Sequence, residues 1–97
     1  MGQDNPVYLN VKTLAVLLGC SHRLVKHLVR TGRISAVRGY TLEEQGVEPS
    51  SLRCGGYYWR NSWWVTVEDF VSYLENIYKP PLDVMDSILA SLGELLE

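Results

Sequence analysis

The segment from Arg23 to Thr31, directly after the turn Gly19-Cys20-Ser21, most constrains the fold of this chain. At about 100° per residue, a helix sorts its side chains onto two faces. The apolar face consists of Leu24, Val25, Leu28 and Val29, and the basic face consists of Arg23, Lys26, His27 and Arg30. One face must cover a core while the other presents concentrated positive charge. This division is typical of the second helix of a helix-turn-helix, which enters a DNA groove.

Signals at both ends delimit another helix before the turn. Asn10 is a good N-cap, because its side chain can accept a hydrogen bond from a free amide of the first turn. Gly19 is the expected C-terminal residue, and Ser21 is the expected N-cap of the basic helix. The inner stripe of this first helix consists of Leu14, Ala15, Leu17 and Leu18. The sequence therefore predicts two helices separated by a tight turn.

The middle of the chain predicts short strands and a long loop. Period-two alternation indicates a strand over 34–38, and aromatic runs over 57–60 and 63–65 indicate a hairpin around Asn61-Ser62. Glycine, proline and serine punctuate residues 39–62, which we expect to form a loop with one helical turn over 41–45. Alternation puts Trp63 on the core face and Trp64 on the opposite face. Trp64 then requires cover from the loop, the last helix or another subunit.

Two further helices are predicted near the C-terminus. Thr66 and Asp69 form an approximate capping box. It opens a helix whose inner positions extend to Ile77 and which Pro80-Pro81 ends. From Leu82 onward, apolar residues recur at three- and four-residue steps, as in an amphipathic helix. We expect an α+β fold, namely a winged helix-turn-helix over residues 1–79 with an enlarged wing at about 39–62, followed by an acidic amphipathic helix over 80–97.

Charge is divided unequally along the chain. The net charge is −2, but residues 1–40 carry +5 and residues 41–97 carry −7. A DNA-facing lobe joined to a solvent- or partner-facing lobe would produce this division. The apolar share of 46% argues against disorder, and no apolar run approaches the roughly 18 residues of a membrane span. Without a signal-peptide pattern we expect a cytoplasmic protein with reduced cysteines.

Two segments resemble phage excisionases and related MerR-like domains. The first runs from Leu9 to Ser21 and continues through the basic helix to Gly32-Arg33-Ile34, and the second runs from Trp63 to Leu74. The resemblance covers roughly residues 8–78 and implies a helix in the major groove with a hairpin wing on the backbone or minor groove. Excisionases, also called recombination directionality factors, bend DNA and direct an integrase without catalysing a reaction, and some repress promoters. This chain departs from the family in its longer wing, its added acidic helix and Trp64, where a basic residue is common.

Each basic residue has an expected role in binding duplex DNA. Side chains at the start of the basic helix should reach base edges, where Arg or Lys donates to guanine. These candidates are Ser21, His22, Arg23, Lys26 and His27. The candidates for phosphate contacts are Lys12, Arg30, Arg33 and Arg38. Arg53 and Arg60 are alternative wing residues, since either loop can form the tip.

Other functions were weighed against DNA binding. Cys20 should point inward and His27 outward, so we expect no metal site and no cofactor. The aromatic cluster over 57–64 either stacks on single-stranded bases or covers a small core. The last helix either packs on its own domain or mediates self-association or partner capture. The surface for that second role would consist of Trp64, Met85, Ile88, Leu89 and Leu92.

The sequence shows no nucleophile–base pair, phosphate loop or metal spacing, so we expect neither an enzyme nor a small-molecule substrate. The prediction is a sequence-specific excisionase-like factor that controls integrase direction and also represses transcription. The alternatives are a small repressor of the same fold, a module that docks on an integrase or repressor through the acidic helix, and a phage packaging subunit that recognises genome ends.

Overall fold

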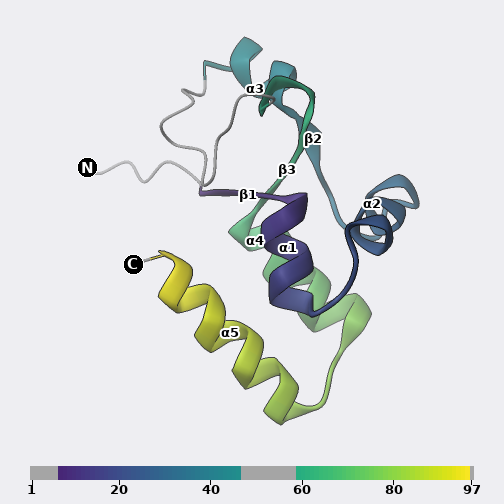
Figure 1. The fold of residues 1–97 in the computed structure, drawn as a ribbon, viewed down its shortest axis with the longest axis vertical. Helices are drawn as coiled ribbons and strands as arrows, with labels where there is room; N and C mark the ends of the chain where they lie inside the picture. Colours follow the sequence, from purple (N-terminus) through teal and green to yellow (C-terminus); the bar gives the residue numbers. More distant parts are fainter. Residues whose placement is uncertain (1–6, 47–58, 97) are drawn as a thin grey trace.

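A computed structural model describes residues 7–46 and 59–96, which form a small α+β domain with a three-stranded antiparallel sheet (Figure 1). The α+β prediction is confirmed. The elements in chain order are β1 (Tyr8–Asn10), α1 (Val11–Leu18), α2 (His22–Arg30), β2 (Val37–Arg38), α3 (Gly39–Glu44), η2 (Trp59–Asn61), β3 (Trp63–Thr66), α4 (Val67–Tyr73), the π-helical turn η3 (Leu74–Tyr78) and α5 (Leu82–Leu96).

Side chains and a glycine delimit the helices where the sequence predicts it. The Asn10 side chain accepts a hydrogen bond from the Thr13 amide at 2.8 Å, and Thr66 Oγ1 accepts one from the Asp69 amide at 3.0 Å. Gly19 ends α1 with φ 68° and ψ 36°, a conformation that favours glycine. These caps satisfy amides and carbonyls at the helix ends that have no partner within the helix.

The sheet has the order β1-β3-β2, so β3 lies in the centre. Leu9 is opposite Val65, and both are buried in the main core. Trp64 lies on the opposite face of the sheet, as alternation predicts, and has 1% of its surface exposed. There it packs in a second cluster with Tyr8 and Leu42. Of the three alternatives for covering Trp64, the structure shows the first, because Leu42 of α3 in the 39–62 segment packs against it.

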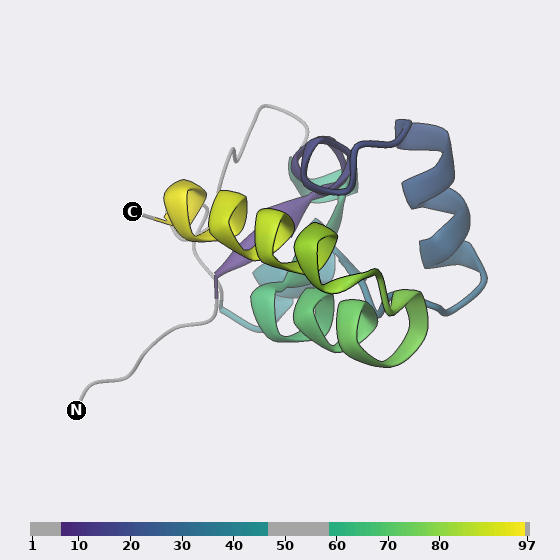
Figure 2. The same cartoon turned by 90° about the horizontal axis from the view of Figure 1, so that it is seen from below.

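The long C-terminal helix packs on its own domain. Ile88 and Leu92 of α5 are 6% and 4% exposed and belong to the main core, together with Leu14 of α1 and Phe70 of α4. Figure 2 shows α5 crossing the domain between α1 and α4, with α2 at the right of the view. Of the two roles weighed for this helix, intramolecular cover is the one observed in the structure.

The strand predicted over 63–65 is confirmed as β3, the strand predicted over 34–38 is confirmed only in part, and the predicted hairpin is wrong. The strand expected over 34–38 contains only Val37–Arg38, because the amides of Arg33 and Ile34 turn back to donate to the Leu28 carbonyl at 2.9 and 3.3 Å. The hairpin around Asn61-Ser62 does not form, since Trp59–Asn61 is a 3-10 turn and β3 pairs with β1 and β2 instead. Residues 57 and 58 of that expected hairpin lie outside the described residues.

The helix after Thr66 also changes its geometry near its end. From Leu74 it continues as a π-helical turn, which rotates each residue by less than an α-helix does. Ile77 is therefore displaced from the inner stripe and is 46% exposed, contrary to expectation. In the part of the chain that the structure describes, no helix combines the length and the apolar character that crossing a bilayer requires.

Candidate nucleic-acid interface

The outer face of α2 is basic and accessible. Arg23, Lys26, His27 and Arg30 are exposed, while Val25 and Leu28 anchor the opposite side in the core. Within residues 7–46 and 59–96, none of Arg23, Lys26 and Arg30 has an ion-pair partner. The division into two faces that the sequence predicts is therefore observed for these residues, and the charge remains available to an anionic partner.

Leu24 is the exception to the predicted division. It is 45% exposed, although its apolar side chain predicts a place on the inner face. The buried stripe is centred between Val25 and Leu28, and Leu24 lies about 70° from that centre at 100° per residue. Val29 lies at the same angle on the other side and is half-buried, so helical periodicity alone does not predict which of the two is exposed. An apolar side chain thus borders the basic face, next to His27.

Both ends of α2 are fixed to the domain. Ser21 Oγ accepts a hydrogen bond from the Leu24 amide at 3.1 Å, which confirms the predicted N-cap. At the other end, the Thr31 hydroxyl donates to the His27 carbonyl at 2.9 Å. Ile34 follows the helix and is 1% exposed, so the chain re-enters the core directly after α2. The basic face therefore has a fixed direction relative to the sheet.

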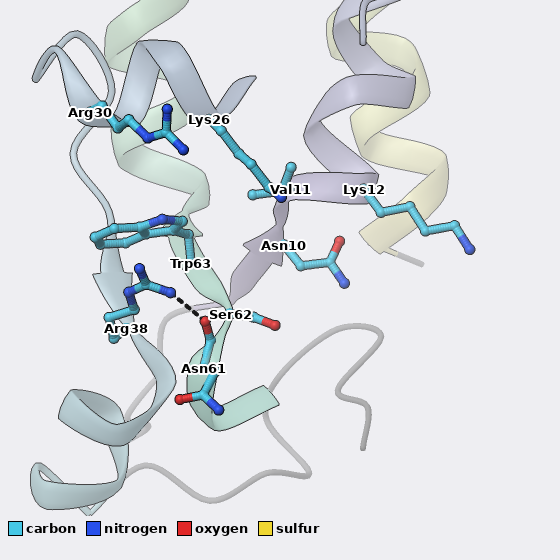
Figure 3. A pocket seen from close by; sticks show the side chains of 9 residues that line it. All are labelled: Asn10, Val11, Lys12, Lys26, Arg30, Arg38, Asn61, Ser62 and Trp63. Carbon is cyan, nitrogen blue, oxygen red and sulfur yellow. Dashed lines mark hydrogen bonds between the residues drawn. The ribbon is translucent and has the colours of Figure 1, made fainter. Parts of the chain in front are cut away.

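A basic cleft of about 360 Å³ lies beside α2 (Figure 3). Its wall has no acidic side chain among the residues that the structure describes. The lining consists of Asn10, Val11, Lys12, Lys26, Arg30, Arg38, Asn61, Ser62 and Trp63. Four cations from α1, α2 and β2 thus share one concavity. In Figure 3, Arg30 and Arg38 lie on either side of the Trp63 ring and Lys26 extends toward Val11, whereas Lys12 points away from them.

Arg38 is held in this cleft by two contacts. It is paired directly with Trp63 across β2 and β3, and its guanidinium carbon lies 4.0 Å from the centroid of the Trp63 ring. Its Nη1 also donates a hydrogen bond to the Asn61 carbonyl. Trp63 is half-buried and lines the cleft. Its position on the main-core side agrees with the predicted alternation, but its principal neighbour is a cation.

The remaining predicted basic residues are less closely grouped. Burial raises the pKa of the Tyr73 phenol, and Arg33, which is exposed just beyond α2, offsets part of that rise. Arg60 Nη2 lies 3.0 Å from Glu43 Oε1, so part of its charge is already balanced. Arg53 lies outside the described residues.

The residues expected at a partner surface are mostly covered by their own chain. Trp64, Ile88 and Leu92 are buried inside the domain and Met85 is half-buried, so these side chains do not form an exposed surface. Only Leu89 is accessible, with 39% of its surface exposed. An amphipathic pattern marks an apolar face but does not reveal which apolar surface covers it. Here α1 and α4 cover the apolar face of α5.

Cys20 and the two histidines do not converge. The Cys20 thiol is half-buried and free, and burial raises its pKa. His22 and His27 are exposed on α2. Across residues 7–46 and 59–96, no three His, Cys, Asp or Glu side chains lie close enough together to hold a metal ion.

Comparisons of the chain with protein families, with curated proteins and with solved structures find no match. The assignment of a function therefore depends on the chemistry of the basic face and the cleft.

Proposed function

We propose that this protein binds double-stranded DNA as a winged helix-turn-helix, with α2 in the major groove. The observation that carries this proposal is the fixed, exposed basic face of α2 beside a cleft lined by Lys12, Arg38 and two cations of α2 itself. Phosphate contacts from several Lys and Arg residues provide most of the affinity of a DNA-binding protein. The acidic residues of α5 extend along a different part of the domain, so they do not oppose this approach (Figure 1).

Different parts of α2 have different tasks in this proposal. Arg23 and Lys26 lie in its first half, and they donate to the O6 and N7 acceptors of guanine. The exposed methyl groups of Leu24 are suited to contact the 5-methyl group of thymine, which supplies an apolar contact beside the polar ones. Arg30 lies at the end of the helix and contacts phosphate, which positions the domain without reading sequence.

Within this class, an excisionase-like role is the more specific part of the proposal. Such a factor binds near an integrase site, bends the duplex and directs recombination, and it also represses a promoter that it overlaps. A small repressor of the same fold is the alternative. The exposed carboxylates of α5, from Asp83, Asp86 and Glu94, favour a further candidate, which is docking of this helix on a basic protein surface such as that of an integrase.

Selection from a random duplex library, followed by fluorescence anisotropy, tests the proposal. We expect a preferred sequence, and we expect Arg23→Ala and Lys26→Ala to reduce affinity by about 5- to 150-fold each, corresponding to about 1–3 kcal/mol per base contact. Lys79→Asn is the matched control, because it removes one exposed charge away from α2 and Asn tolerates the left-handed φ of 51° at that position. If all three variants bind like the wild type, α2 is not the reading helix.

A further inference from the structure

We propose that the basic cleft is the binding site for one phosphodiester group of the DNA backbone, and that Trp63 is the positioning residue that holds Arg38 ready for it. This inference rests on the proposed function and deepens it. It assigns the cleft to a single chemical group and gives a role to an aromatic residue that makes no base contact.

The charges of the cleft favour an anion. Arg30 of α2 and Arg38 of β2 lie on either side of one indole ring, and Lys12 and Lys26 line the same cleft (Figure 3). Like charges gathered in one concavity repel each other unless a negative group enters. None of the described residues that line the cleft is acidic, so none of them provides that group there.

Arg38 is oriented before any ligand binds. The Trp63 ring covers one face of the guanidinium at 4.0 Å, and the Asn61 carbonyl accepts a hydrogen bond from Nη1. A guanidinium has five N–H donors in a planar fork, so donors remain for the paired oxygens of a phosphate. Because its rotation is restricted on both counts, Arg38 loses less side-chain entropy on binding than a free arginine would.

The composition of the cleft favours a phosphodiester over a small organic ligand. Small-molecule sites are mostly apolar with a few polar groups, whereas this cleft has four cations and a single indole. It also includes Arg30, the residue of α2 that contacts phosphate in the proposed function, so a strand that passes α2 in the groove brings its backbone to the same place. An acidic peptide would match the charge but not this continuity with α2.

A double-mutant cycle on Trp63 and Arg38 tests the inference. Affinity is measured by anisotropy between 50 and 200 mM salt, for a selected duplex and a scrambled one. Arg38→Ala should weaken both duplexes equally, by about eightfold at 0.1 M salt, and should reduce the magnitude of the salt slope by about 0.9, which is the contribution of one phosphate. Trp63→Leu should also weaken both duplexes but should retain the salt slope, because Arg38 keeps its charge. Trp63→Phe should restore part of the binding, and Trp63→Leu should have no further effect once Arg38 is alanine.

The outcomes separate this inference from the proposed function. Unchanged affinity and salt slope in Arg38→Ala would overturn the cleft assignment, while the effect of Arg23→Ala would still support α2 as the reading helix. Equal and independent losses from the two cleft variants would overturn the positioning role of Trp63. If Trp63→Leu does not fold, Arg38→Lys supplies the second measurement. It keeps the charge but not the planar fork of donors, so it should retain the salt slope and lose affinity.

Discussion

Truncation of Leu92 distinguishes a helix that stabilises its own domain from one that awaits a partner. Leu92 is 4% exposed in the main core, and Leu92→Ala removes the equivalent of about three methylene groups. At about 0.8 kcal/mol for each buried group, the transfer contribution alone is roughly 2.4 kcal/mol. A residual cavity adds to this, so the expected loss of unfolding free energy is about 2–4 kcal/mol. That is a large part of the 5–15 kcal/mol by which a domain is stable.

Urea unfolding followed by tryptophan fluorescence measures this loss, and sedimentation equilibrium measures the mass of the same samples. Leu82→Ala is the matched control, because it makes the same substitution in the same helix at a side chain that is 81% exposed. We expect its unfolding free energy to stay within about 0.5 kcal/mol of the wild type. The reasoning is refuted if Leu92→Ala leaves the urea midpoint unchanged and instead converts an oligomer to a monomer.

Three shorter predictions follow from single residues. Leu24→Ala should leave the unfolding free energy within about 0.5 kcal/mol, because the side chain is 45% exposed, yet weaken binding to duplexes with a thymine at the contacted position, as a comparison of thymine with uracil in one site would show. Gly19→Ala should cost about 1 kcal/mol in thermal unfolding from its φ of 68° alone, since an added Cβ meets no atom within 4 Å, and Gly19→Asn should cost less. Burial raises the pKa of the Cys20 thiol above its ordinary value, so the folded state holds this proton more tightly than the unfolded state. The unfolding free energy should therefore fall as the pH rises above about 8.5, the ordinary pKa of a thiol, and the fall should be shallower in Cys20→Ala. Alkylation of the peptide containing Cys20 at pH 8, measured by mass spectrometry, should be slower without urea than with it.

Local signals in the sequence were sufficient for the helices. Asn10, Gly19, Ser21 and Thr66 act through atoms within three or four residues along the chain, so their roles can be recognised without knowledge of the fold. The two faces of α2 follow from helical periodicity in the same way. The misplacement of Leu24 arose at the edge of that pattern, where Leu24 and Val29 lie at equal angles from the buried stripe but only Leu24 is exposed.

Contacts between distant segments could not be predicted in this way. The alternation of β3 correctly separates Trp63 from Trp64, but it does not indicate that Leu42 covers one and Arg38 the other. The expected hairpin failed because β3 pairs with β2 across 24 intervening residues instead of with its immediate predecessor. The cleft likewise depends on this pairing, since β2 brings Arg38 to the side of the sheet where α2 lies. Sequence reasoning identified the cations but not their meeting place.

The pairing of β2 with β3 also allows the connection between these two strands to vary in length. Residues 39–62 leave and re-enter the sheet at adjacent points, where the Gly39 amide donates to the Ser62 carbonyl at 3.1 Å. Closing 24 residues instead of four costs only about 1.6 kcal/mol of chain entropy, because the cost grows with the logarithm of length. The contact of Leu42 with Trp64 and Tyr8 can offset such an amount. Evolution can therefore graft or shorten a segment at this junction while the helices that follow and precede it keep their places.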